Sequence, residues 1–192
     1  MRIQVAQQPE ADDLLGRDPL ALLIGMLLDQ QVPMERAFTG PYTIAVRLGR
    51  DHISGLDAHE IAAYDPEAFA ELLARKPAVH RYPKAMAQRV QRLAAYLVEH
   101  YGGKAEAIWA DVADGAELLR RLMALPGFGE QKAQIFVALL GKRLGVRPPG
   151  WREAAGPYGE EGVHRSVADV VDAESLAKVR QAKREAKRAI RK

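Results

Sequence analysis

Apolar residues recur at intervals of three and four along most of the chain, which is the spacing of amphipathic helices. The clearest case runs from Pro83 to about Tyr101 and is closed by Gly102–Gly103. A largely apolar helix is expected after Asp18–Pro19, ending near Gln31. Further helices are expected around 34–48, with a break at Gly40–Pro41, and around 57–64, 66–75, 105–112 and 115–124. Only RIQVA at the start suggests a strand, so the pattern predicts an all-α protein.

The regular pattern stops at Gly145. Residues 146–164 contain three prolines and four glycines, and a proline inside a helix removes a hydrogen bond and clashes with the preceding turn. Helical spacing resumes at Ser175, where most of the helix surface is polar. We therefore expect one domain over residues 1–172, followed by a basic helical tail over 173–192 whose first turn is docked and whose remainder is solvated.

The composition is that of a globular protein with a sizeable core. Of the 192 residues, 48% are apolar and 28% are charged, which excludes global disorder. The chain has no cysteine, which excludes disulfides, Cys-ligated zinc and cysteine-held iron–sulfur clusters. No apolar run approaches the roughly 18 residues needed to span a bilayer, and the acidic start is unlike a signal peptide. We expect a cytoplasmic protein without a membrane partner.

The net charge of +3 hides an uneven distribution. Residues 173–192 hold eight Lys or Arg against Glu174 and Glu185, whereas residues 1–172 hold 20 basic and 23 acidic residues. Within that body, residues 72–98 contain six basic side chains and no acidic one. Both stretches favour a polyanion partner, although solvated helix faces and solubilising tails have the same composition.

The segment 118–143 has the pattern of two helices joined by a glycine bend. A helix is expected to end at about Ala124, a tight turn (LPGFG) to follow over 125–129, and a second helix to begin near Glu130. Glycine accepts positive φ and leaves no side chain between the backbone and an approaching ligand. The amides of such a turn, at the N-terminus of the following helix, form a cradle for an anion such as a phosphate.

The sequence LPGFGEQKA in this bend resembles the helix-hairpin-helix motif of the HhH-GPD DNA glycosylase superfamily. Two further segments agree with this family in order and separation. LLIGMLLDQQV resembles its first core helix, which ends in a glutamine pair, and RYPKAMAQRVQRLAAYLVEHYGG resembles the helix before the hairpin. The resemblance covers roughly residues 19–144. Without cysteines it points to the cluster-free branches, and the glutamine pair favours those that remove alkylated purines.

The resemblance implies a two-lobed all-α fold in which the hairpin grips double-stranded DNA while a damaged base is turned out into a cleft. It implies no cofactor and no metal beyond a monovalent cation at the hairpin carbonyls. We expect a monomer, associated with the nucleoid if bacterial. For Gln31 the alternative to DNA contact is a polar helix cap, and for Trp151 it is an anchor that packs its loop onto the body. The residues implied to contact DNA are Gln31, Pro126, Gly127, Phe128, Gly129, Gln131, Lys132 and Trp151.

At the catalytic positions the sequence departs from this family. Members with lyase activity place a nucleophilic lysine two residues after the second hairpin glycine, where this chain has Gln131. Lys132 is the next residue, and one residue rotates a helical side chain by roughly 100°. Lyase chemistry through a Schiff base is therefore not expected. Lys132 is either a displaced catalytic amine or a solvent-facing lysine near a phosphate.

The family's aspartate, which stabilises positive charge on the sugar, is also missing. The window 148–152 reads PPGWR, and no aspartate occurs between Glu130 and Asp169. A carboxylate is needed because negative charge offsets the developing oxocarbenium ion. Glu153 is the nearest acid, and Asp29 beside the glutamine pair is a second candidate. The alternatives are a surface loop acid for the first and a helix-end acid for the second.

The sequence therefore leads to two main functional hypotheses. The first is a monofunctional glycosylase of base-excision DNA repair, which hydrolyses the N-glycosidic bond of a damaged, for example alkylated, base after base flipping. The second is a non-catalytic DNA- or lesion-binding protein of the same fold, because the family's lysine and aspartate are not at their expected positions. A third hypothesis is a protein-interaction factor that uses the basic tail.

Overall fold

The computed structural model describes residues 3–51 and 53–191, and these residues form helices and loops without a strand. The prediction of an all-α protein is therefore confirmed for this part of the chain. Four short helical turns lie among the α-helices: η1 (Ala105–Ile108), η2 (Leu140–Leu144), η3 (Gly156–Gly159) and η4 (Val167–Asp169). The α-helices are α1 (Pro9–Arg17), α2 (Pro19–Leu28), α3 (Met34–Arg47), α4 (Ala58–Ala63), α5 (Pro66–Ala74), α6 (Pro83–Tyr101), α7 (Gly115–Met123), α8 (Glu130–Leu139), α9 (Trp151–Ala154) and α10 (Ala173–Ile190).

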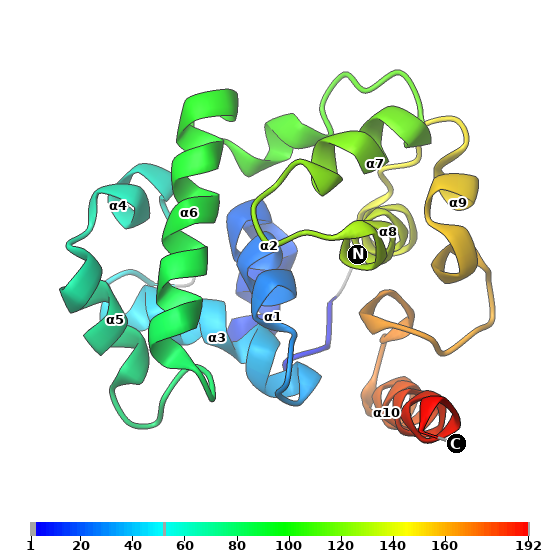
Figure 1. Ribbon diagram of the computed structural model, residues 1–192, viewed down its shortest axis with the longest axis horizontal. Coiled ribbons are helices and arrows are strands. Elements are labelled where there is room, and N and C mark those ends of the chain that lie inside the picture. The colour runs from blue at the N-terminus through cyan, green and yellow to red at the C-terminus, as the bar shows by residue number, and fades with distance from the viewer. Residues whose placement is uncertain (1–2, 52, 192) are drawn as a thin grey trace.

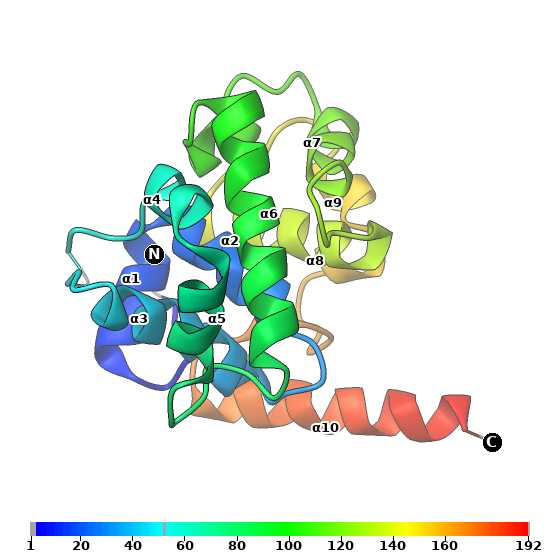
Figure 2. The same ribbon diagram turned by 60° about the vertical axis from the view of Figure 1, so that its left-hand side comes forward.

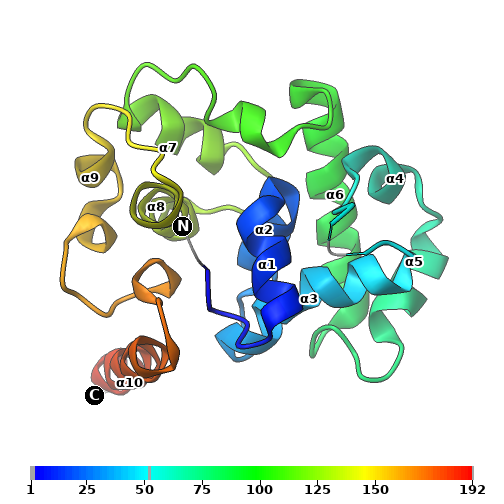
Figure 3. The same cartoon turned by 180° about the vertical axis from the view of Figure 1, so that it is seen from behind.

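The helices pack in two groups (Figure 1). In the first group, α2 packs on α1 and α3, and α6 packs on α4 and α5. In the second group, α7, α8 and α9 pack on one another, and α10 contacts η4. The turn η1 touches α2, α6 and α7, so it joins the two groups. Figure 2 shows α6 rising along the first group, and Figure 3 shows α1 in front when the molecule is seen from behind.

Helix α2 lies between the two groups because it is apolar on every side. All of its residues except Pro19 are buried, as expected for a helix without a polar face. Asp18 caps its N-terminus, where the carboxylate accepts hydrogen bonds from the amides of Leu20 at 2.9 Å and Leu56 at 2.7 Å. Burial raises the pKa of this carboxyl group. The helix ends at Leu28, so the glutamine pair lies just beyond its C-terminus.

The first residues differ from the prediction at one element and contain one helix that was not predicted. The predicted strand is absent from residues 3–6, where Ile3 and Val5 pack into the core from an irregular segment; residue 2 of that prediction lies outside the described residues. Helix α1 was not predicted, because it buries only Ala11, Leu14 and Leu15 and is otherwise polar. A short helix with so few apolar positions gives little periodic signal.

The predicted break at Gly40–Pro41 is also wrong, because α3 continues through both residues. Gly40 serves close packing rather than a bend, since a Cβ at this position would lie 2.6 Å from Leu28 Cδ1. Pro41 lacks an amide donor, but it is buried, and its apolar contacts offset the lost backbone hydrogen bond.

The predicted helical hairpin is confirmed as local structure. Helix α7 begins after Asp114, whose side chain caps it by accepting a hydrogen bond from the Glu117 amide at 2.8 Å. Its buried face carries Leu118 and Leu122. The bend over 125–129 follows, and α8 begins at Glu130.

Residues 145–172 contain no long regular helix, as predicted, but they form the short helical turns α9, η3 and η4, and Trp151 anchors the segment to the body. Trp151 lies against Gly141, where a Cβ would come within 2.4 Å of its ring carbons. Only 8% of Trp151 is exposed, because its ring fills the space above this glycine. This packing agrees with the alternative role of Trp151 as an anchor, and its contact with DNA stays a prediction.

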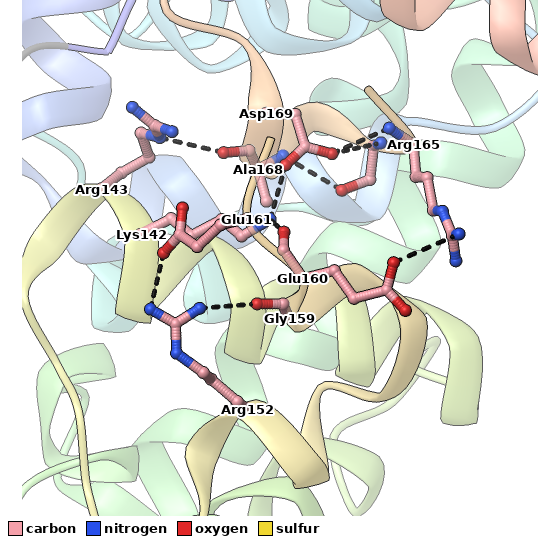
Figure 4. A network of polar contacts seen from close by, with 10 residues as sticks. Lys142, Arg143, Arg152, Gly159, Glu160, Glu161, Arg165, Ala168 and Asp169 are labelled. Atoms are coloured by element: carbon pink, nitrogen blue, oxygen red, sulfur yellow. Dashed lines mark hydrogen bonds and ion pairs between the residues drawn. The ribbon is translucent and has the colours of Figure 1, made fainter. Parts of the chain in front are cut away.

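A polar network holds the end of this segment (Figure 4). Lys142 Nζ donates to Asp169 Oδ1 and to the Glu160 carbonyl, each at 2.6 Å, and the two side chains of the ion pair are 3% and 4% exposed. Asp169 Oδ2 also accepts from the amides of Arg165 at 2.8 Å and Ser166 at 3.1 Å. Asp169, the first aspartate after the hairpin, is therefore a buried structural carboxylate.

Helix α10 docks through its first half. Ser175, Leu176 and Val179 are its buried residues, whereas every described residue from Arg184 onward is exposed. Figure 2 shows the C-terminal end of α10 extending beyond the rest of the described chain. The expectation of a docked start and a solvated remainder agrees with this arrangement.

Candidate functional site

The inner side of the bend between α7 and α8 packs against helix α2. Gly127 has a φ of 84°, and a Cβ at this position would lie 2.5 Å from Leu27 Cδ1. Leu125 and Phe128 are buried on the same side, and the Phe128 amide donates to the Leu125 carbonyl at 3.1 Å. The Phe128 ring packs edge-on against Phe136, so only its backbone is placed to contact DNA, and that contact stays a prediction.

The outer side of the bend is open. Gly127 and Gly129 are both exposed, and a Cβ on Gly129 would meet nothing within 4 Å. Gly129 is the N-cap of α8 and makes no side-chain cap. Neither glycine amide donates to another group within residues 3–51 and 53–191. Unpaired amides at the positive end of a helix dipole are the elements of an anion-binding site.

Two arginines of α6 stand beside this bend. Arg89 and Arg92 line a cavity of about 500 Å³ together with residues 125–129. Met86, Val90 and Leu93 occupy the buried side of α6. Arg89 Nη1 donates to Gln30 Oε1 at 2.6 Å, which is a neutral partner, so its positive charge is not cancelled there. The basic stretch identified in the sequence thus contributes two cations to the predicted anion cradle.

Lys132 does not face solvent. It is half-buried, and its Nζ donates to the Met26 carbonyl at 2.6 Å and to the Leu27 carbonyl at 3.4 Å. These carbonyls lie in the last turn of α2, where a cation is favoured by the negative end of the helix dipole. Burial lowers the pKa of Lys132 to about 8, against the opposing attraction of Asp29. The expected solvent-facing lysine is therefore wrong; Lys132 ties α8 to α2.

This lowered pKa predicts a pH dependence of stability. Because the folded-state pKa of about 8 lies below the value of 10.5 expected for the unfolded chain, the unfolded state binds more protons between these values. The free energy of unfolding should therefore rise by roughly 1 kcal/mol from pH 7 to pH 9 relative to Lys132→Met. Urea unfolding of both proteins across this range measures the difference, and parallel profiles would contradict the buried position of the amine.

Asp29 also lies at the C-terminal end of α2, where Lys132 is bound. It follows the last residue of α2, its side chain is 9% exposed, and its Oδ2 is 3.6 Å from Lys183 Nζ of α10. It also interacts electrostatically with Lys132. The structure thus brings Asp29 and Lys132 together, which are two of the three predicted catalytic candidates.

The glutamine pair is held by a histidine that the sequence analysis did not assign. His80 Nε2 lies 2.9 Å from the Gln30 carbonyl, and His80 Nδ1 accepts from the Tyr82 amide at 3.0 Å. Burial lowers the pKa of His80, so the neutral ring carries its proton on Nε2 and donates it to Gln30. Gln31, with a φ of 58°, is exposed next to this tether. His80 and Gln30 are 50 positions apart, so no sequence motif indicates that the His80 ring bonds the Gln30 carbonyl.

Of the remaining predicted site residues, Pro126 and Gln131 lie at the hairpin, whereas Glu153 lies near the N-terminal end of α7. Pro126 lines the cavity, and Gln131 is exposed, with its amide nitrogen donating to the Tyr158 hydroxyl at 2.9 Å. Glu153 is exposed and lies near Gly150, which contacts Gly115 at the start of α7. About ten residues of helix, or roughly 15 Å, separate that end of α7 from the bend. Its position does not support Glu153 as the acid at this site.

Within the described ranges there is no group of three or more His, Cys, Asp or Glu side chains placed to hold a metal ion. None of the described helices combines the length and the apolar character needed to cross a bilayer.

Comparisons of the chain with protein-family profiles, with curated proteins and with solved structures found no match. The resemblance of three sequence segments to one superfamily therefore stays a prediction. The structural support for a function comes from the geometry of the bend.

Proposed function

We propose that the chain is a DNA-binding protein of base-excision repair that removes a damaged base by hydrolysis. The observation that supports this most is the open bend over 125–129, with unpaired glycine amides flanked by Arg89 and Arg92. Backbone amides and arginines are the groups that hold phosphate oxygens without reading base sequence. The three sequence segments that resemble HhH-GPD glycosylases correspond to α2 with the residues after it, to α6 and to the hairpin itself. Leu27 of α2 lies against Gly127, and Arg89 and Arg92 of α6 flank the bend.

Asp29 is the carboxylate that fits the chemistry best. In hydrolysis, the bond between the sugar C1′ and the base nitrogen breaks and its electron pair leaves with the base. Positive charge then develops on C1′ and the ring oxygen. Water adds to C1′, and the proton it loses passes through solvent to the departing base or, where an alkylated base already leaves neutral, to bulk solvent. A poorly exposed carboxylate that follows α2 and interacts with Lys132 of α8 stabilises this charge in a low-dielectric setting. Lys132 is engaged by the α2 carbonyls, and our proposal does not include lyase chemistry.

A second candidate function is lesion binding without hydrolysis. One observation favours it: Lys183 lies 3.6 Å from Asp29 and offsets the negative charge that catalysis needs. In this alternative the bend and the arginines keep the same role, and Asp29 serves only to position α10. The two candidates share DNA binding and differ in base release.

The experiment is a base-release assay on duplexes that carry an alkylated, a deaminated or an oxidised base. We expect release of the alkylated base, and a loss of at least roughly 100-fold in Asp29→Asn. The matched control is Glu153→Gln, which removes a charge at the far end of α7 and should retain full activity. Thermal unfolding of each variant checks that the fold is kept.

Titration of the same duplexes at several salt concentrations separates the possible outcomes. Binding whose affinity falls steeply with salt, without release of any base, would favour lesion binding over hydrolysis. Binding that is absent or insensitive to salt would reject both functions. Equal activity in Asp29→Asn and the parent would remove Asp29 from the mechanism.

A further inference from the structure

The second half of α10 is a row of positive charges outside the body. Residues 184–191 are all exposed. They include four basic side chains and one acid, Glu185, which accepts a hydrogen bond from Gln181 at 3.0 Å. In contrast, the basic side chains of the first half are paired, as Lys178 is with Glu174 at 2.6 Å. The four basic residues of this row are Arg184, Lys187, Arg188 and Arg191.

These four side chains share one face of the helix, because their positions are separated by three, four and seven residues. Arg180 and Lys183 belong to the same stripe, and both point to the body. Arg180 Nη1 is 2.7 Å from Glu35 Oε1, and Lys183 Nζ is 3.6 Å from Asp29 Oδ2. The exposed row therefore continues a face whose inner end lies against the C-terminal end of α2.

The row extends on the side of the molecule where the hairpin lies. Figure 2 shows the C-terminal half of α10 projecting on the same side as the connection between α7 and α8. In Figure 1 this end of the helix points toward the viewer. Lys183, where the row leaves the body, interacts electrostatically with Lys132 beneath the hairpin. A polyanion held at the bend would therefore run close to α10.

Like charges one turn apart destabilise this part of the helix. Arg184 and Arg188 form such a pair, as do Lys187 and Arg191. A projecting helix also gains nothing from packing. A polyanion removes this repulsion, whereas a neutral or basic partner does not. Duplex DNA carries one charge about every 1.7 Å, so a stripe of eight residues, about 12 Å long, spans several phosphates.

We propose that residues 184–191, the end of α10 with its C-cap Arg191, form a second phosphate-binding arm, which contacts the backbone of the duplex held by the hairpin. Arg180 and Lys183 anchor this arm through Glu35 and Asp29, and the four exposed cations bind phosphates without regard to base sequence. This inference rests on the proposed DNA binding and adds a second contact region to it, distinct from the bend.

The test compares two variants that lose the same charge. Arg184→Gln/Arg188→Gln removes two cations from the arm, and Arg17→Gln/Lys104→Gln removes two exposed cations from α1 and from the loop after α6. Duplex affinity is measured against salt for both and for the parent. We expect the slope of log affinity against log salt to fall by about 1.8 in the arm variant. The affinity should fall roughly tenfold or more near 0.1 M salt, whereas the control should keep the parent slope.

A series of duplex lengths gives an independent readout. The parent should lose affinity as the duplex becomes too short to reach the arm, and the arm variant should be insensitive over that range. If the parent binds DNA and the arm variant keeps its slope and length dependence, the arm is overturned while the hairpin function stands. If the arm and control variants lose equal affinity, only net charge matters and the inference fails. If the parent does not bind DNA, the proposed function itself fails.

Discussion

Replacing Gly129 with aspartate is expected to abolish duplex binding while leaving the fold intact. Gly129 is the N-cap of α8 with φ of −73° and ψ of 177°, a conformation that any residue adopts, and a Cβ there meets nothing within 4 Å. Aspartate is a favourable N-cap residue, so the free energy of unfolding should change by only about 0.5 kcal/mol. Its carboxylate would, however, occupy the amides proposed to hold phosphate and repel the incoming anion.

The measurement is fluorescence anisotropy of a labelled duplex, with thermal unfolding of the same samples. We expect the affinity to fall more than roughly 50-fold, because an amide contact is lost and a like charge is added. Gly129→Ser is the matched control, since serine also caps the helix but adds no charge. If the aspartate variant bound as tightly as the serine variant, phosphate would not approach the bend at Gly129.

The largest expected loss of stability comes from Lys142→Met. Methionine matches the stem of lysine but leaves the Asp169 carboxylate, which is 4% exposed, without its charged partner. Breaking a buried ion pair on one side typically costs about 3–5 kcal/mol. Chemical denaturation measures this loss as a lower midpoint with an unchanged slope.

The companion variant Asp169→Asn should be milder. Its amide oxygen can still accept from the Arg165 and Ser166 amides, and Lys142 keeps its hydrogen bond to the Glu160 carbonyl. The double variant should cost less than the two single variants added together, because the pair is coupled. A cost below about 1 kcal/mol for Lys142→Met would contradict the expectation that the buried Asp169 carboxylate depends on this partner.

The hairpin could be predicted from the sequence because its signals are local. Glycines mark the bend, Asp114 caps the first helix, and apolar spacing identifies the helices on either side. The same spacing determines which side of α6 is buried, and it leaves Arg89 and Arg92 on another side. That these two arginines meet the bend depends on how α6 and the hairpin pack, which periodicity does not determine.

The surroundings of Lys132 and Trp151 could not be predicted, because each depends on contacts remote in sequence. Lys132 reaches carbonyls at Met26 and Leu27, more than one hundred positions earlier. Trp151, at the start of α9, packs on Gly141; an anchor of this kind was the favoured interpretation of the sequence, but its partner glycine could not be identified. His80 was not assigned a role for the same reason, since its partner Gln30 lies beyond the end of α2, 50 positions earlier.

The attachment of the hairpin to α2 has a consequence for how a duplex would be received. The bend sits on Leu27 at Gly127, and α8 is tied to the end of the same helix by Lys132, so both sides of the turn are fastened to the centre of the molecule. These contacts hold the bend over 125–129 in place before any partner binds. In the proposed complex the nucleic acid would have to bend instead, so we expect flexible steps or helices already weakened by a lesion to be accepted more readily than stiff ones.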